Sequence, residues 1–252
     1  MTRLFLAATQ TVTITAAILS ASTASADEIR VLSSVGIKAV VEELAPQFEK
    51  TTKHKVTTVF DLASAQKTKI DAGERFDVAI LTPALIDDLI AKGTIASASR
   101  AVVARTGLGL MIRGGARKPD ITTVDTFKKT LLDAKAITLV PAGASGVAFL
   151  ATAKKLGIAD TIKTKPAASG EEVNANVTSG AADIAILPIS EILPVKGAQL
   201  GGVFPADVQT FIVMAAGVSA KAQGSAARDF VTFLMSKAND PVIKAKGMER
   251  TP

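Results

Sequence analysis

Short apolar runs alternate with amphipathic segments along the first third of the chain. The apolar runs are typical of buried strands, and the segments between them repeat apolar residues at helical spacing. Strands are expected at 29–33, 56–60 and 76–81, and helices at 38–51, 64–72 and 83–92. The last two helices stop at Gly73 and Gly93, as helices often do. This order predicts a mostly parallel sheet with right-handed crossovers.

The pattern changes after residue 100. Two β-rich runs, at 101–105 and 107–112, follow each other without a helix, and a similar run recurs at 208–215. Between these runs the alternation resumes, and two helices close the chain. Further helices are expected at 124–134, 146–156, 171–179, 222–237 and 241–246, and further strands at 137–140 and 183–187.

We infer from this change a two-lobed α/β fold, in which each lobe is a mostly parallel sheet flanked by helices. Two hinge segments, near 108–112 and 208–215, would cross between the lobes. Lobe 1 would then comprise residues 27–108 plus 209–252, and lobe 2 residues 109–208. A single, larger doubly wound domain is the alternative that the pattern leaves open.

The first 26 residues have the composition of an export signal. Arg3 precedes a mainly apolar run from Leu4 to Leu19, and Ala24-Ser25-Ala26 fits the small-x-small cleavage pattern. An uncleaved membrane anchor is the alternative, but five polar residues between Thr9 and Thr15 dilute the apolar run. We therefore predict cleavage after Ala26 and a soluble periplasmic product.

Composition narrows the function classes. The 252 residues contain no Cys, Trp or Tyr and a single histidine, His54. Thiol catalysis and disulfides are excluded, and neither a metal site nor a catalytic triad is expected around His54. The net charge of +6 is spread along the chain without a block of like charges. This favours attraction of small anions and predicts no nucleic-acid partner.

Three strand-to-helix loops carry the candidate chemistry. The first holds Ser33, Ser34 and Gly36, the second Ala63 and Ser64, and the third Ala142, Gly143 and Ser145. Such loops present unpaired backbone N–H groups at helix N-termini, where the helix dipole favours negative charge. Each serine alone is also a favoured helix cap, so it is the convergence of the three loops that predicts a small-anion site.

Several motifs extend this interpretation. Ile29-Arg30-Val31-Leu32-Ser33-Ser34 follows the secreted start, and Ile70-Asp71-Ala72-Gly73 leads into Phe76-Asp77-Val78-Ala79-Ile80. Later come Val140-Pro141-Ala142-Gly143, Gly180-Ala181-Ala182-Asp183-Ile184 and Val203-Phe204-Pro205. With these motifs the chain resembles the periplasmic substrate-binding proteins of ABC importers, most closely the molybdate-binding branch.

The resemblance implies a receptor that holds a tetrahedral oxyanion such as molybdate or tungstate and passes it to a membrane permease. Carried over by motif, the lobe 1 contacts fall at Ser33, Ser34 or Gly36 and at Ala63 or Ser64. The lobe 2 contacts fall at the N–H groups of Ala142 and Val173, beside Gly143. Two positions depart from the branch: Gly36 stands where a serine is common, and Leu187 where a tyrosine is common. Either Ser33, Ser34 and Ser190 compensate, or the anion is a different one.

Lys38 and Lys67 bear on the choice of anion, because each lies near the start of a helix behind a candidate loop. If either points into the site, a small carboxylate becomes the alternative ligand; otherwise both are solvated surface residues. We expect a monomeric binding protein that is not an enzyme and carries no cofactor. A ligand sensor is a second possibility. A secreted hydrolase is disfavoured because the chain has no Gly-x-Ser-x-Gly elbow.

Overall fold

The computed structural model describes residues 27–251, so the expected signal peptide at 1–26 lies outside the described residues. Within them, the alternation of strands and helices is present in the expected order. The first half comprises β1 (Glu28–Ser34), η1 (Val35–Ile37), α1 (Lys38–Thr52), β2 (Lys55–Asp61), α2 (Ala63–Asp71), β3 (Val78–Leu81), α3 (Pro83–Ala91), η2 (Ser97–Ser99), β4 (Ala101–Arg113) and α4 (Val124–Asp133).

The second half adds three elements that the sequence pattern did not predict, β6, α7 and β8. It comprises β5 (Ile137–Leu139), α5 (Ala144–Lys155), β6 (Thr164–Pro166), α6 (Gly170–Ser179), β7 (Ile184–Pro188), α7 (Ile189–Ile192), β8 (Ala198–Val203), η3 (Ala206–Val208), β9 (Phe211–Val218), α8 (Ala226–Met235), η4 (Lys237–Asn239) and α9 (Asp240–Ala245). None of the helices in this described part of the chain is long and apolar enough to cross a lipid bilayer.

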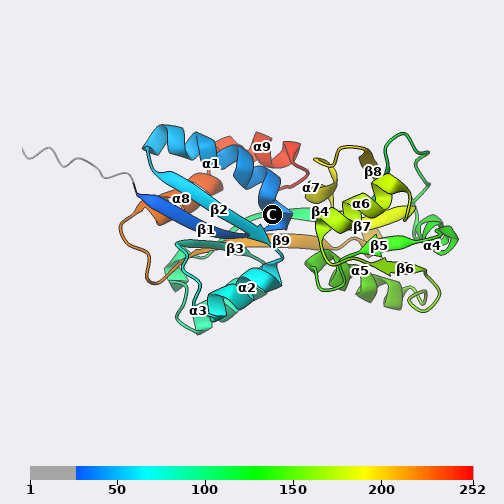
Figure 1. Cartoon of the computed structure of the whole chain (residues 1–252), viewed down its shortest axis with the longest axis horizontal. Helices are drawn as coiled ribbons and strands as arrows, with labels where there is room; N and C mark the ends of the chain where they lie inside the picture. The colour runs from blue at the N-terminus through cyan, green and yellow to red at the C-terminus, as the bar shows by residue number, and fades with distance from the viewer. Residues whose placement is uncertain (1–26, 252) are drawn as a thin grey trace, which may run out of the picture.

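The strands pair in the order β2-β1-β3-β9-β4-β7-β5-β6, with β8 on β4. Among the strands described in 27–251, every antiparallel pair includes β4 or β9, and the other pairs are parallel. Figure 1 shows two groups of elements joined by β4 and β9. We call the group around β1, β2 and β3 lobe 1 and the group around β5, β6, β7 and β8 lobe 2.

Strand β4 corrects the expectation of two separate runs. It is continuous from Ala101 to Arg113: residues 101–107 pair with β9, and residues 108–113 pair with β7 and β8. The polar Arg105-Thr106 step does not break it, because the Thr106 hydroxyl donates to the Gly247 carbonyl at 2.9 Å and Arg105 pairs with Glu249. The lobe boundaries at 108/109 and 208/209 stay a prediction.

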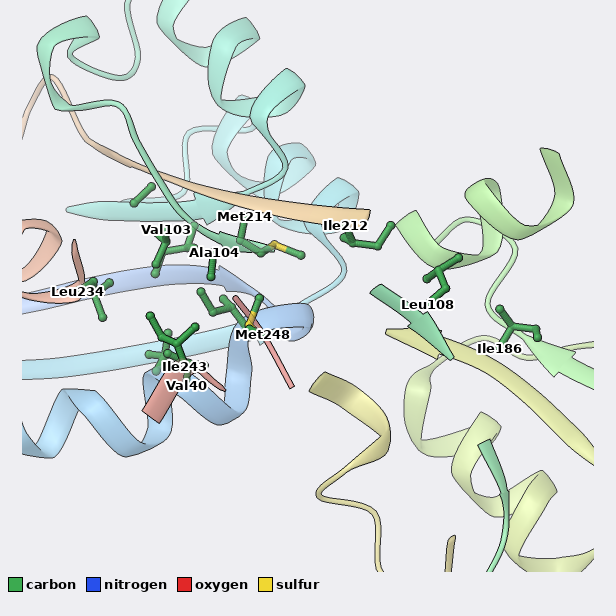
Figure 2. Close-up of a cluster of buried hydrophobic side chains, with 14 of the residues drawn as sticks. Val40, Val103, Ala104, Leu108, Ile186, Ile212, Met214, Leu234, Ile243 and Met248 are labelled. Carbon is green, nitrogen blue, oxygen red and sulfur yellow. The ribbon is translucent and has the colours of Figure 1, made fainter. Parts of the chain in front are cut away.

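The core is continuous between the lobes. Figure 2 shows a row of buried side chains that begins with Val40 and Leu234 in lobe 1. The row continues through Met214 and Ile212 on β9 to Leu108 and Ile186 toward lobe 2. These side chains belong to one cluster of buried apolar residues, each at most 6% exposed. Because packed cores resist deformation, this cluster fixes where the strand ends of the two lobes lie relative to each other.

Candidate functional site

A cavity of about 200 Å³ lies where the carboxyl ends of β1, β3, β5 and β7 approach each other. We call it the serine cavity, because Ser34, Ser64 and Ser145 line it. In open α/β sheets ligands bind beyond the carboxyl ends of the strands, and this cavity has that position. It is lined from lobe 1 by the starts of α2 and α3, and from lobe 2 by the start of α5 and by α7.

Three helices begin at the serine cavity without a side-chain cap. The N-cap residues are Leu62 for α2, Thr82 for α3 and Gly143 for α5, and no side chain of residues 27–251 accepts a cap hydrogen bond there. Leucine and glycine have no side-chain acceptor, which leaves the first N–H groups of α2 and α5 open to a ligand. By contrast, Ser169 caps α6. The open N–H groups and their dipoles favour an anion.

Hydroxyl groups supplement these amides. Ser34 accepts the Gly36 N–H at 3.2 Å, so its own hydroxyl hydrogen stays available. Ser64, Thr82 and Ser145 also line the cavity, and no hydrogen bond from their hydroxyls is found within the described part of the chain. The cavity therefore offers neutral donors from both lobes.

Six of the predicted site residues line this cavity: Ser34, Ala63, Ser64, Ala142, Gly143 and Leu187. Three do not line it, namely Ser33, Gly36 and Val173, and their contact with a ligand stays a prediction. Ser33 is fully buried, because alternate residues of a strand face opposite sides, and its hydroxyl donates to the Ser34 carbonyl at 3.1 Å. Val173 lies a turn inside α6 among buried apolar residues, and its N–H is bonded to the Ser169 carbonyl at 3.1 Å.

Gly36 is the third predicted residue that does not line the serine cavity. Its N–H is donated to Ser34, and its carbonyl accepts the Ser190 hydroxyl at 2.8 Å. A Cβ at this position would lie 2.5 Å from the Met214 methyl and 3.7 Å from Glu191 Oε1. The space of a side chain at position 36 is thus taken by Met214 and Glu191. Gly36 shapes the site without lining it.

A second cavity, of about 350 Å³, adjoins the first. We call it the lysine cavity, because Lys38 lines it. Both cavities share Val35, Leu62, Gly170 and Glu191 as wall residues. The lysine cavity also contains the side chain of Asn174, whose buried Oδ1 has no partner among residues 27–251. A buried acceptor without a partner carries a free-energy cost.

The two candidate lysines differ in position. Lys38 lies at the lysine cavity, with Nζ 5.6 Å from the Phe60 ring centre and 3.7 Å from Glu42 Oε1. Lys67 is absent from both cavity walls. It is buried between α2 and α3, where it pairs with Asp71 and with Asp88 at 2.7 Å. The hydrogen bonds that the Lys67 ammonium donates to these two carboxylates raise the pKa of Lys67 and so keep it charged.

Glu191 is the one charged side chain among the described residues that line the serine cavity, and the sequence pattern did not indicate it. It projects from the short helix α7, which the sequence pattern did not predict, and it lines both cavities. Burial in the cleft and then the negative charge of Glu171 raise the pKa of Glu191 to about 7. The pKa of Glu171 is lowered instead, because its carboxylate accepts its own backbone N–H and a hydrogen bond from Ser169.

Comparison with known proteins agrees with this architecture. The family model for bacterial extracellular solute-binding proteins matches residues 29–249. The chain belongs to this family. A relative named molybdate-binding protein ModA, from Azotobacter vinelandii, is 28% identical over 241 residues, covering 91% of this chain and 92% of the relative. A solved periplasmic molybdate-binding protein of Azotobacter vinelandii superimposes with a TM-score of 0.75 at 21% identity, covering 89% of this chain and 100% of the other.

A second relative has a different activity. An aconitate isomerase from Pseudomonas sp. is 30% identical over 233 residues, covering 89% of this chain and 88% of the relative. Its name is that of an enzyme that acts on an unsaturated carboxylate, whereas the molybdate-binding relatives are named for an inorganic oxyanion. Family membership therefore assigns solute binding but leaves the ligand open.

For this solute-binding protein, the chemistry of the site follows from its donors. Residues 27–251 contain no cluster of three or more side chains suited to hold a metal ion. The serine cavity provides amide and hydroxyl donors without a basic side chain, and the adjoining cavity adds the Lys38 ammonium. Thr82 was missed as a lining residue, although the Thr82-Pro83 step after a buried strand is a fourth strand-to-helix loop of the same type.

Proposed function

We propose that this solute-binding protein captures a small organic anion with more than one carboxylate group and delivers it to the permease of an ABC importer. The observation that carries the proposal is the convergence of three uncapped helix N-termini, from both lobes, on one cavity. One carboxylate would accept hydrogen bonds from the amides of α2 and α5 and from the hydroxyls of Ser34, Ser64 and Ser145. A further carboxylate would extend into the lysine cavity toward Lys38.

The resemblance by itself implies a molybdate-like oxyanion, but two features of the site favour a carboxylate. Gly36 and Leu187 supply no hydroxyl at positions where the molybdate branch commonly has one, so a tetrahedral oxyanion would lack two donors. The serine cavity is also joined to a larger cavity that contains a lysine. The relative that acts on an unsaturated carboxylate supports the same ligand class.

Isomerisation of an unsaturated carboxylate is a second candidate function. It is favoured by Glu191, a titratable carboxylate placed at the junction of the two cavities. An ionised Glu191 could remove a proton from a carbon next to a carboxyl group and return it to the third carbon of the allylic unit, with the double bond shifting in between. The reaction balances without a cofactor. We therefore propose, as one of two functions to be tested, that the chain binds its ligand without converting it, and the isomerase is the alternative.

Export, location and assembly also stay predictions. We propose cleavage after Ala26, a periplasmic product and a monomer without a nucleic-acid partner. N-terminal sequencing of the exported protein tests the first point. A membrane-bound form that begins at Met1 or Thr2 would contradict it.

The ligand class is tested by calorimetry on the mature protein with molybdate, tungstate, sulfate, phosphate, citrate, cis-aconitate and trans-aconitate. A carboxylate is expected to bind more tightly than any inorganic anion. Ser34→Ala and Ser64→Ala should each weaken its binding by roughly one to two decades, because a hydrogen bond to a charged group contributes about 1.5–3 kcal/mol. Ser97→Ala, an exposed serine of η2 remote from the cavity, is the matched control. Unchanged affinity in both site variants would place the site elsewhere.

The enzymatic alternative is tested by following cis-aconitate by proton NMR in the presence of the protein. A stoichiometric complex without conversion supports a receptor. Catalytic conversion to the trans isomer that disappears in Glu191→Gln supports an isomerase.

A further inference from the structure

The Glu191 carboxyl group lies at the boundary between the serine cavity and the lysine cavity. A Cβ placed on Gly36 would be 3.7 Å from Oε1, and one on Gly170 would be 3.9 Å from Oε2. These two glycines belong to the start of η1 in lobe 1 and the start of α6 in lobe 2. Glu191 is therefore positioned where a ligand held by both lobes would meet it.

The charged groups that line the lysine cavity beside Glu191 come from three elements. Helix α1 contributes Lys38 and Glu42, β2 contributes Asp61, and α6 contributes Glu171. Lys38 is 3.7 Å from Glu42, and Asp61 pairs with Lys69 at 2.7 Å. No ion pair within the described chain includes Glu191.

An anion in this site would approach Glu191 under unfavourable electrostatics. If Glu191 were ionised, two negative charges would face each other in a partly dehydrated cleft, where the open helix N-termini and the Lys38 ammonium offset the repulsion only in part. If Glu191 is protonated, the repulsion disappears and its O–H becomes one more hydrogen-bond donor.

We propose that Glu191 is a ligand-contacting residue that binds the anion as a carboxylic acid, so that anion capture takes up one proton. This inference rests on the proposed anion site and adds a determinant that the family resemblance did not assign. It makes capture stronger in an acidic environment and release easier where the pH is higher. Burial and the charge of Glu171 raise the pKa of Glu191 to about 7, so the acid form is accessible near neutral pH.

The test measures binding of two probes, trans-aconitate and molybdate, by calorimetry between pH 5.5 and 8.5. Each titration is repeated in two buffers of different ionisation enthalpy, which gives the number of protons taken up. For the probe that binds, we expect the Kd to rise about tenfold per pH unit above pH 7 and uptake of nearly one proton at pH 8. In Glu191→Gln, whose amide is a neutral donor at every pH, binding should stay tight and both effects should vanish.

Glu171→Gln is the matched control, because it changes a carboxylate in the same cavity. It should retain proton uptake, with the pH dependence moved to lower pH, since the negative charge that raises the pKa of Glu191 is removed. Binding with the same pH dependence in wild type and Glu191→Gln would overturn the inference while leaving the anion site intact. Failure of both probes to bind at any pH would overturn the inference and the proposed function together.

Discussion

Replacing Glu191 with glutamine should stabilise the protein at alkaline pH. The pKa of Glu191 is raised from 4.5 to about 7 in the folded protein, so between these values the folded state binds more protons than the unfolded state. Stability contributed by this group is therefore present at low pH and is lost as the pH rises from about 4.5 to 7. At about 1.4 kcal/mol per pH unit, the full effect is on the order of 3 kcal/mol.

Urea denaturation of the mature protein at pH 4.5, 6 and 8 measures this effect. Glu191→Gln should match the wild type at pH 4.5 and exceed it by about 3 kcal/mol at pH 8, a rise in Tm of about 6–12 °C for a protein of this size. Glu171→Gln should have the opposite sign at pH 8, because the pKa of Glu171 is lowered by hydrogen bonds to its ionised form. A Glu191→Gln variant that is no more stable than the wild type at pH 8, or that differs equally at all three pH values, would refute the reasoning.

Three further predictions concern one glycine behind the serine cavity and two basic residues that line neither cavity. Gly146→Ala should lower the free energy of unfolding by about 3 kcal/mol in urea denaturation, because its Cβ would lie 2.0 Å from the Val140 carbonyl oxygen. A higher free energy of unfolding, as alanine usually gives in place of glycine within a helix, would contradict this. Arg250→Met should cost about 2 kcal/mol in the same assay, since its guanidinium donates to three backbone carbonyls and to Asp240; a neutral effect would contradict it. Lys67→Met should leave anion affinity within twofold of the wild type by calorimetry, and a larger loss would mean that Lys67 reaches the ligand.

Much of the fold was predictable because the first lobe follows strong periodic signals. Helix α1, expected at 38–51, spans Lys38–Thr52, and α3, expected at 83–92, spans Pro83–Ala91. The elements that were missed have weak local signals. Strand β8 contains Gly201 and Gly202, which have low strand propensity but fit here because Ile112 and Ile121 occupy the space of a side chain. Strand β9 begins three residues later than expected, after the turn formed by η3.

The candidate site was predictable only as far as local loop chemistry reaches. Ser34, Ser64 and Ala142 line the cavity because loops at the carboxyl ends of strands meet there. Whether Ser33 or Ser34 faces the cavity depends on strand register, and a shift of one residue reverses the face. Glu191 could not be found from a motif, because its position depends on how α7 packs beside Gly36 and on the approach of the two lobes.

The central claim, an anion held by open helix N-termini from both lobes, is tested most directly by amide chemical shifts. A ¹⁵N-labelled sample would be titrated with trans-aconitate and, separately, with molybdate. We predict that one of these anions causes saturable downfield shifts of the amide protons of Ser64 and Ser145, at the starts of α2 and α5. Saturable shifts confined to other parts of the chain, or no shift with either anion, would contradict the account.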